Sequence, residues 1–312
     1  MFTRTIVFIK TDNLKKENLF RKTIEDSFKT ELPLSYGFQD TNLQKSILIL
    51  KEALSEDYRI DLGFTSNCIT SGCRKIITRL CSLNKIDSIV TTAGGIEEDI
   101  IQSLDRQFQN IAEEYDDKDL FQKGYFRSGN RVARSNGYTL LEKHLEEILD
   151  DLPEKTISSG DLIKKITTGD GYLPKIDNVF CPCIEDGAIG DYLYIRAKRG
   201  LPLLEVSFTK DHYIFQQQLI NEKRKKLAIL LGGSIPKHYI LNSSILSGGY
   251  DKVILLNTGL YYDGSNAGAQ PSEAYSWSKV AVTGDIVKVF GDFTITFPLL
   301  IEKAGIDIRD IF

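Results

Sequence analysis

The sequence predicts an α/β protein with a doubly wound, mostly parallel sheet and helices on both faces, in a Rossmann-like arrangement. Short runs rich in Ile, Val and Leu recur from about residue 59 onward and alternate with helical stretches. Strands that are covered on both faces read as near-continuous apolar runs, so these runs indicate a parallel sheet flanked by helices. The six runs are Ile60–Phe64, Ser88–Thr92, Asn178–Cys181, Leu227–Leu231, Val253–Leu256 and Ile286–Phe290.

Helical patterns precede and interrupt this rhythm. We expect residues 1–58 to form a helical N-terminal segment, and residues from about 103 to 172 to form a mostly helical insertion that covers the sheet. No internal repeat or long linker divides the chain, so residues 1–312 are predicted to form a single domain. The clearest helical patterns are Leu14–Phe28, Asn42–Leu54 and Tyr138–Leu149.

Composition excludes several classes of protein. With 39 Lys and Arg against 43 Asp and Glu, the net charge of −4 is the wrong balance for binding a phosphate backbone, so we expect no nucleic-acid ligand. The first apolar stretch, Ile6–Ile9, is too short for a signal peptide, and no run approaches the roughly 18 residues of a membrane span. Five cysteines are an odd number for a disulfide framework, and the spacing of Cys181 and Cys183 with only three His predicts no metal site. We therefore expect a cytoplasmic protein.

Polar or glycine-rich segments follow all six apolar runs. Because open α/β sheets bind ligands beyond the carboxyl ends of their strands, we expect these segments to outline one large site. Neither of the common phosphate-binding glycine motifs occurs. The segment Thr92–Gly95 would let a cofactor approach the backbone closely, with Glu97, Glu98 and Asp99 opening the next helix. Carboxylates in a first helical turn also simply suit the helix dipole, and the sequence leaves both interpretations open.

The stretch from Asp263 to Lys279 combines a glycine-rich loop with the only Trp of the chain, Trp277. A lysine that is partly buried beside an aromatic ring loses proton affinity and can attack a carbonyl or imine carbon. An ordinary solvated surface lysine is the alternative interpretation of Lys279. The sequence therefore indicates a candidate nucleophile at the end of this loop.

Carboxylates gather in or beside the strand-end segments. A cleft lined by many carboxylates suits a multiply charged cation, and Trp277 would add cation–π attraction, so a polyamine is the expected ligand. His238 could move protons near neutral pH or be a partly buried structural histidine. The carboxylates are Glu97, Glu98, Asp186, Asp191, Asp263 and Glu273.

The chain closely resembles the deoxyhypusine synthase family from about residue 37 to residue 301. The resemblance is carried by six ordered motifs: TSNCITSG (65–72), VTTAGGIEED (90–99), EDGAIGD (185–191), LLGGSIPKH (230–238), NTGLYYDGSNAGAQPSEAYSWSK (257–279) and VFGDFTITFPLL (289–300). It implies a homotetrameric enzyme with sites shared between subunits. It also implies NAD as cofactor, spermidine as substrate, and a hypusine-bearing translation factor precursor as protein substrate.

The family's functional residues carry over by motif. The resemblance implies Lys279 as the nucleophile, with Glu98 and His238 as catalytic proton carriers. For NAD it implies contacts from Ser66, Asn67, Cys68, Ile69, Thr70, Thr92, Ala93, Gly94, Glu98, Asp186, Gly233, Thr258, Gly259, Asp292 and Phe293. For spermidine it implies contacts from Glu97, Glu98, Asp191, His238, Asn242, Gly264, Ser265, Asn266, Glu273, Trp277 and Lys279.

The implied reaction moves the 4-aminobutyl group of spermidine, through an imine on Lys279, to a lysine of the factor. It releases 1,3-diaminopropane and forms deoxyhypusine, and the cofactor is regenerated. Asn266 departs from the family pattern, which has Asp there, so a charge-assisted bond to the amine becomes a neutral one. This departure keeps two alternatives open: a homospermidine-forming relative, and a catalytically weak paralogue that acts as a partner subunit.

Overall fold

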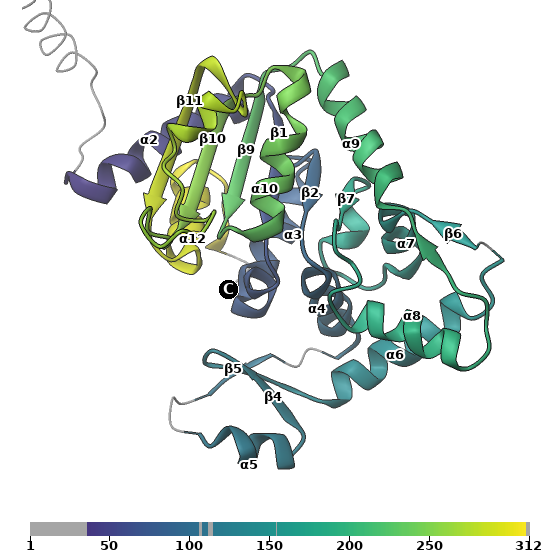
Figure 1. Cartoon of the computed structure of the whole chain (residues 1–312). Helices are drawn as coiled ribbons and strands as arrows, with labels where there is room; N and C mark the ends of the chain where they lie inside the picture. The colour runs from purple at the N-terminus through teal and green to yellow at the C-terminus, as the bar shows by residue number, and fades with distance from the viewer. Residues whose placement is uncertain (1–35, 106–107, 112–114, 154, 310–312) are drawn as a thin grey trace, which may run out of the picture.

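The centre of the molecule is a six-stranded sheet in which every neighbouring pair of strands is parallel (Figure 1). The computed structural model describes residues 36–105, 108–111, 115–153 and 155–309. All six predicted strands are present, and the predicted α/β fold class is confirmed. In spatial order they are β11 (Val280–Phe290), β10 (Tyr250–Asn257), β9 (Lys226–Leu231), β1 (Arg59–Phe64), β2 (Ser88–Val90) and β7 (Val179–Phe180).

The order of the strands locates the ligand-binding edge. Read from β7, the sheet runs third, second, first, fourth, fifth, sixth in chain order, which is the doubly wound order of dinucleotide-binding folds. The order reverses between β1 and β9, whose registers pair Phe64 with Leu231 at their carboxyl ends. Ligands bind such sheets in the crevice beyond this reversal point, so we expect the residues after Phe64 and Leu231 to line the ligand-binding site.

Helices cover both faces of the sheet, and the strands divide their side chains between them. In β9, Ile229 and Leu231 pack into one core, whereas Ala228 and Leu230 pack into the other. This two-residue alternation is what a buried strand requires. Figure 1 shows α10 in front of the sheet and α12 behind it. The flanking helices are α2 (Phe38–Ser55), α3 (Arg74–Ser82), α4 (Ala93–Leu104) and α12 (Phe293–Lys303) on one face, and α9 (Phe208–Asn221) and α10 (Ser234–Ser243) on the other.

The N-terminal prediction is confirmed where it can be compared. The helix expected over Asn42–Leu54 is α2, which begins earlier, at Phe38, and ends at Ser55. The helix expected over Leu14–Phe28 lies outside the described residues. No helix in the described ranges is both long enough and apolar enough to cross a membrane.

The segment from 103 to 172 differs from the mostly helical expectation. It contains helices, but also an antiparallel sheet of three strands in the order β3-β5-β4. The hairpin turn is Gly129-Asn130, where Gly129 has a φ of 59°, and such a two-residue turn is a strong hairpin signal that the helical interpretation missed. Figure 1 shows this hairpin below the carboxyl ends of the central strands. The elements are β3 (Gln109–Asn110), α5 (Asp117–Gln122), β4 (Tyr125–Ser128), β5 (Arg131–Arg134), α6 (Asn136–Leu149), β6 (Thr156–Ile157), α7 (Ser159–Ile166) and part of the α7–β7 connection.

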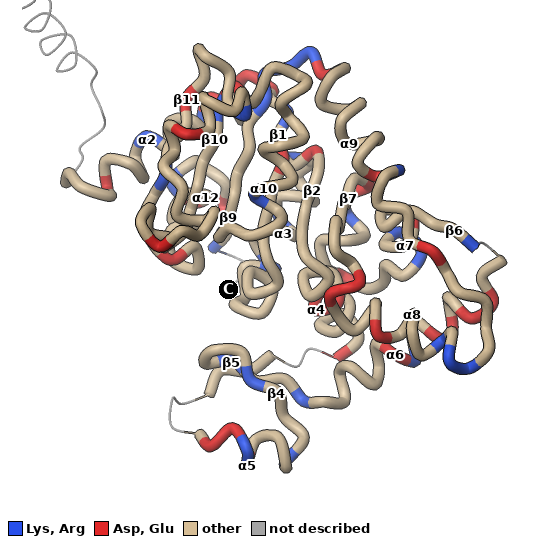
Figure 2. Tube along the Cα trace, in the orientation of Figure 1, with Lys and Arg blue, Asp and Glu red and all other residues tan. Residues whose placement is uncertain are grey.

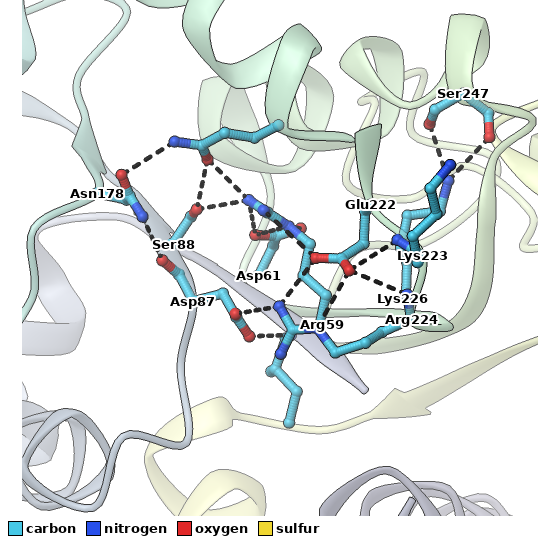
Figure 3. Close-up of polar contacts among 12 residues, drawn as sticks. Arg59, Asp61, Asp87, Ser88, Asn178, Glu222, Lys223, Arg224, Lys226 and Ser247 are labelled. Carbon is cyan, nitrogen blue, oxygen red and sulfur yellow. Dashed lines mark hydrogen bonds and ion pairs between the residues drawn. The ribbon is translucent and has the colours of Figure 1, made fainter. Parts of the chain in front are cut away.

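A buried polar network ties the strands together at their amino ends, opposite the expected ligand edge (Figure 3). Arg59, at the start of β1, donates from Nε to both oxygens of Asp61 and from Nη2 to Ser88 Oγ, at 2.7 Å, on β2. Asp61 also accepts a hydrogen bond from the hydroxyl of Tyr250 on β10, at 2.8 Å. Arg59 and Asp61 are 5% and 0% exposed, so hydrogen bonds within the protein replace those that water would otherwise make to this pair. The network fixes strands on both sides of β1 and makes a rigid support for the opposite edge.

Candidate active site

The loops after β1 and β2 fit together closely at the carboxyl edge. The backbone N–H of Ser66 donates to Thr92 Oγ1 at 3.2 Å. A Cβ atom added to Gly94 would lie 2.8 Å from Cβ of Ser66, so only glycine allows this approach. Thr92 is extended and precedes α4, which leaves the first N–H groups of that helix at the ligand edge. The predicted cofactor segments 66–70 and 92–94 are therefore adjacent in the structure.

Two glutamates of α4 are buried beside these loops. Glu97 Oε1 accepts a hydrogen bond from the backbone N–H of Ile189, at 2.9 Å, in the first turn of α8 (Ala188–Lys198). Glu98 Oε2 accepts one from Thr70 Oγ1 at 2.5 Å. Burial is the main cause that raises the pKa of each carboxyl group to about 7. Either residue can therefore gain or lose a proton near neutral pH.

Further carboxylates strengthen the negative charge at this position. The charges of Asp191 and Asp186 also raise the pKa of Glu97, and the charge of Glu97 raises that of Glu98. Figure 2 shows acidic residues on the segment that joins β7 to α8. We name Glu97, Glu98, Asp186 and Asp191 the acidic cluster. Its concentration of negative charge suits a ligand with several positive charges.

A second group of predicted residues lines a cavity between α10 and the glycine-rich loop. The Nζ atom of Lys279 lies 5.6 Å from the ring centroid of Trp277, within cation–π distance. Burial lowers the pKa of the Lys279 amine, and the charge of Glu273 opposes this effect. We name this cavity the amine pocket; its lining includes Lys237, His238, Asn266, Glu273, Trp277 and Lys279.

His238 links the amine pocket to a wider adjoining hollow of about 470 Å³, which Asn242 also lines. The side-chain amide of Asn242 donates to Nδ1 of His238 at 2.7 Å, so the neutral ring carries its proton on Nε2. Burial, followed by the charges of Lys279 and Lys237, lowers the pKa of His238 below 6.5. His238 is therefore a neutral imidazole at physiological pH, and it can pass a proton through Nε2.

The glycine-rich loop is shaped by close backbone contacts. A Cβ atom on Gly259 would lie 2.8 Å from the carbonyl carbon of Ala267, and one on Gly233 would lie 2.5 Å from Cβ of Ala267. Gly264 and Ser265 lie in the exposed part of this loop, where the Ser265 N–H donates to Asp263. At the other end, Ser278 has a φ of 55°, a left-handed conformation that a non-glycine residue adopts at a cost. This strained residue stands directly between Trp277 and Lys279.

The remaining predicted residues lie at the ends of the outer strands. Thr258 and Gly259 follow β10, whose last residue, Asn257, accepts from the Gly259 N–H at 3.0 Å. The amide nitrogen of Asn257 is buried and has no hydrogen-bond partner among the residues that the structure describes. Asp292 caps α12 by accepting from the Thr294 N–H at 2.8 Å, and Phe293 begins that helix. These residues continue the ligand edge beyond β9.

One chain does not bring all the predicted residues into one cavity. Among the described residues, the amine pocket contains Lys279 and His238 but neither Glu97 nor Glu98. The acidic cluster lies after β2 and β7, on the other side of the reversal point. Within one chain the residues expected to outline one large site therefore form two groups, the acidic cluster and the amine pocket.

The structure also shows features that sequence reasoning missed. Neither Lys237 nor Lys288 is among the predicted site residues, yet both side chains contact the glycine-rich loop. No motif in the sequence marks a buried lysine. A separate cavity of about 770 Å³, next to α3, is lined by Arg74, Arg79 and Arg131 and contains none of the predicted site residues.

Comparisons with known proteins agree with this fold. A model of the deoxyhypusine synthase family matches residues 31–304. A Thermococcus gammatolerans protein named as a deoxyhypusine synthase is 36% identical over 86% of this chain and 87% of its own. A Senecio vernalis protein named homospermidine synthase 2 is 34% identical over 91% of this chain and 87% of its own. The crystal structure of an Entamoeba histolytica protein described as a deoxyhypusine synthase has a TM-score of 0.60, with 22% identity over 95% of this chain and 96% of its own, and supports the fold.

The protein is therefore an enzyme built on a doubly wound parallel sheet, with its candidate site at the point where the strand order reverses. The chain belongs to the deoxyhypusine synthase family.

Proposed function

We propose that this enzyme transfers the 4-aminobutyl group of spermidine to a lysine of a hypusine-bearing translation factor precursor, through an imine on Lys279. The observation that carries the proposal is the partly buried Lys279 amine, which lies against Trp277 in a chain of this family. An amine whose pKa is lowered by burial supplies the neutral form that attacks an imine carbon. A fully solvated lysine at position 279 would keep its ordinary pKa and would not supply this neutral form at physiological pH.

We propose NAD as the cofactor, and the strand-end loops fit it. Ser66 and Gly94 lie too close together for a Cβ atom at position 94, and the buried amide nitrogen of Asn257 has no partner in the described part of the chain. Both features suit a ligand that lies along the carboxyl edge. Asp292 at the start of α12 is available for a ribose hydroxyl. When bound, NAD supplies the acceptor for a hydride from the carbon beside the secondary amine of spermidine and later returns it.

The acidic cluster and the amine pocket would divide the remaining work. Carboxylates of the acidic cluster bind the ammonium groups of spermidine. Glu98, with a pKa of about 7, takes a proton from the secondary amine, and neutral His238 is the second group able to do so. The Lys279 amine then bonds to the imine carbon while the bond to 1,3-diaminopropane breaks. The lysine of the factor displaces Lys279 in the same way.

We further propose that a working site forms between two chains of a homotetramer. The acidic cluster of one chain would face the amine pocket of its neighbour, because the two are separate within one chain and their charges are complementary. The proposed chemistry would then take place in sites shared between subunits. Such an enzyme would work in the cytoplasm, with no contact with nucleic acid or membrane.

Incubation of the purified protein with NAD, labelled spermidine and the factor precursor tests the proposal. We expect label on the precursor and release of 1,3-diaminopropane. The same incubation with putrescine as acceptor tests the second candidate, homospermidine formation, which is favoured by the neutral Asn266 in the amine pocket and by the Senecio relative. Label found only in a small polyamine would replace the protein-modifying assignment with this second one. No label on either acceptor would point to a catalytically weak partner subunit.

A further inference from the structure

Three lysines from three different elements converge on the glycine-rich loop. Lys237 is on α10, Lys279 follows α11 (Glu273–Ser276), and Lys288 is on β11. The Lys237 ammonium donates to the backbone carbonyl of Asn266, and the Lys288 ammonium donates to that of Gly259 at 2.5 Å. Lys237 is only 8% exposed. Lysine is almost never fully buried without a charged partner, so this cluster requires an explanation.

The two carbonyl contacts lie near opposite ends of the exposed part of the loop. Residues 260–266, between them, are solvent-exposed. Close packing also fixes the loop, because Gly259 and Gly233 lie so near Ala267 that neither position has room for a Cβ atom. The two ammonium groups therefore hold the loop near both ends of its exposed part, and the Lys237 contact fixes the backbone of Asn266 at the amine pocket.

The lysines also act on one another electrostatically. Burial, followed by the charges of Lys288 and Lys279, lowers the pKa of Lys237 to about 8. Two carboxylates oppose this effect: Glu273 on α11 acts on Lys237 and Lys279, and Asp263 in the loop acts on Lys288. His238 faces Lys279 from α10 as a neutral ring. Because Coulomb repulsion is mutual, a charged Lys237 also disfavours a charged Lys279.

We propose that Lys237, supported by Lys288, is a positioning residue for Lys279: it holds the glycine-rich loop over the amine pocket and places a positive charge that disfavours protonation of the Lys279 amine. The inference rests on the proposed function in that Lys279 is the nucleophile. A purely structural anchor would need only a hydrogen-bond donor. The electrostatic role requires a cation at position 237.

The test measures how Lys279 reacts with formaldehyde and cyanoborohydride between pH 6 and pH 10, without NAD or spermidine. Mass spectrometry of peptides gives the methylation rate of Lys279 relative to exposed Lys85 of the same molecule. In K237M we expect that relative rate at pH 7.5 to fall about tenfold, which corresponds to a rise of about one pKa unit. In K237R, which keeps the charge, the rate should stay within about twofold of the wild type. K288M should shift it in the same direction as K237M, by about threefold, and remains informative if K237M does not fold.

Glu273→Gln gives the opposite sign. Removal of the carboxylate that favours the charged form should raise the relative rate of Lys279 at pH 7.5. An unchanged pH profile in both folded K237M and K288M, or equal losses in K237M and K237R, would overturn the electrostatic role. A wild-type protein that methylates Lys279 as predicted but forms no adduct with spermidine and NAD would instead count against the proposed function alone.

Discussion

Replacement of Glu98 by Gln tests whether ionisation of this buried carboxyl group destabilises the folded protein. Burial raises the pKa of Glu98 from its ordinary 4.5 to about 7, so the folded protein resists ionisation of this group. For an acid with a raised folded-state pKa, the folded state loses stability as the pH rises from 4.5 towards 7. The difference of about 2.5 pKa units corresponds to about 3 kcal/mol at pH 8.5. The substituted glutamine side chain carries no charge and keeps an oxygen for the Thr70 hydroxyl, so the variant avoids this cost.

The assay is urea unfolding of the wild type and the Glu98→Gln variant at pH 5 and pH 8.5. We expect similar free energies of unfolding near pH 5, where the folded wild type is protonated at Glu98, and a gain of about 3 kcal/mol for the variant at pH 8.5. Glu147→Gln, at an exposed position of α6, is the matched control and should show no pH-dependent gain. The reasoning would be refuted if the difference in free energy of unfolding between variant and wild type were the same at both pH values. It would also be refuted if the variant were less stable than the wild type at pH 8.5.

Three other substitutions have expected outcomes. Lys279→Ala should keep part of the NAD-dependent release of 1,3-diaminopropane but lose transfer to the factor, and product analysis showing full transfer would exclude the covalent route. Asp61→Asn leaves the buried Arg59 without its carboxylate and should cost about 3–5 kcal/mol in urea unfolding, whereas an unaffected stability would mean that the network does not support the sheet. Ser278→Gly should relieve the left-handed conformation at φ 55° and raise the free energy of unfolding by about 1 kcal/mol; a destabilised variant would show that Ser278 is not strained.

The sheet was predictable because its strands leave two separate signals in the sequence. Runs such as Leu227–Leu231 are apolar throughout, and each is followed by the polar or glycine-rich residues that a carboxyl edge requires. The hairpin of β4 and β5 was missed because its strands are short and lack a two-residue alternation of apolar and polar residues, and its signal is confined to the two residues Gly129-Asn130. The periodicity of apolar residues does not reveal a strand whose main sequence signal is the adjoining turn.

The sequence predicts which residues belong to the candidate site, but not how the fold groups them. Motifs predict Glu98 and Lys279 as site residues, but they carry no information on whether the two share a cavity within one chain. Lys237 and Lys288 were not predicted for a different reason. Whether a lysine can be buried depends on which carbonyl its ammonium group contacts, and each of these lysines contacts a carbonyl, of Asn266 or Gly259, that is 29 residues away in the sequence. Only the folded arrangement reveals these contacts.

Borohydride reduction tests the central claim most directly. The protein is incubated with spermidine and NAD, reduced, digested and analysed by mass spectrometry. The mechanism predicts one stable aminobutyl adduct on Lys279, dependent on NAD and absent from the Lys279→Arg variant. Complete incubation that leaves Lys279 unmodified, or that places the adduct on another lysine, would contradict it.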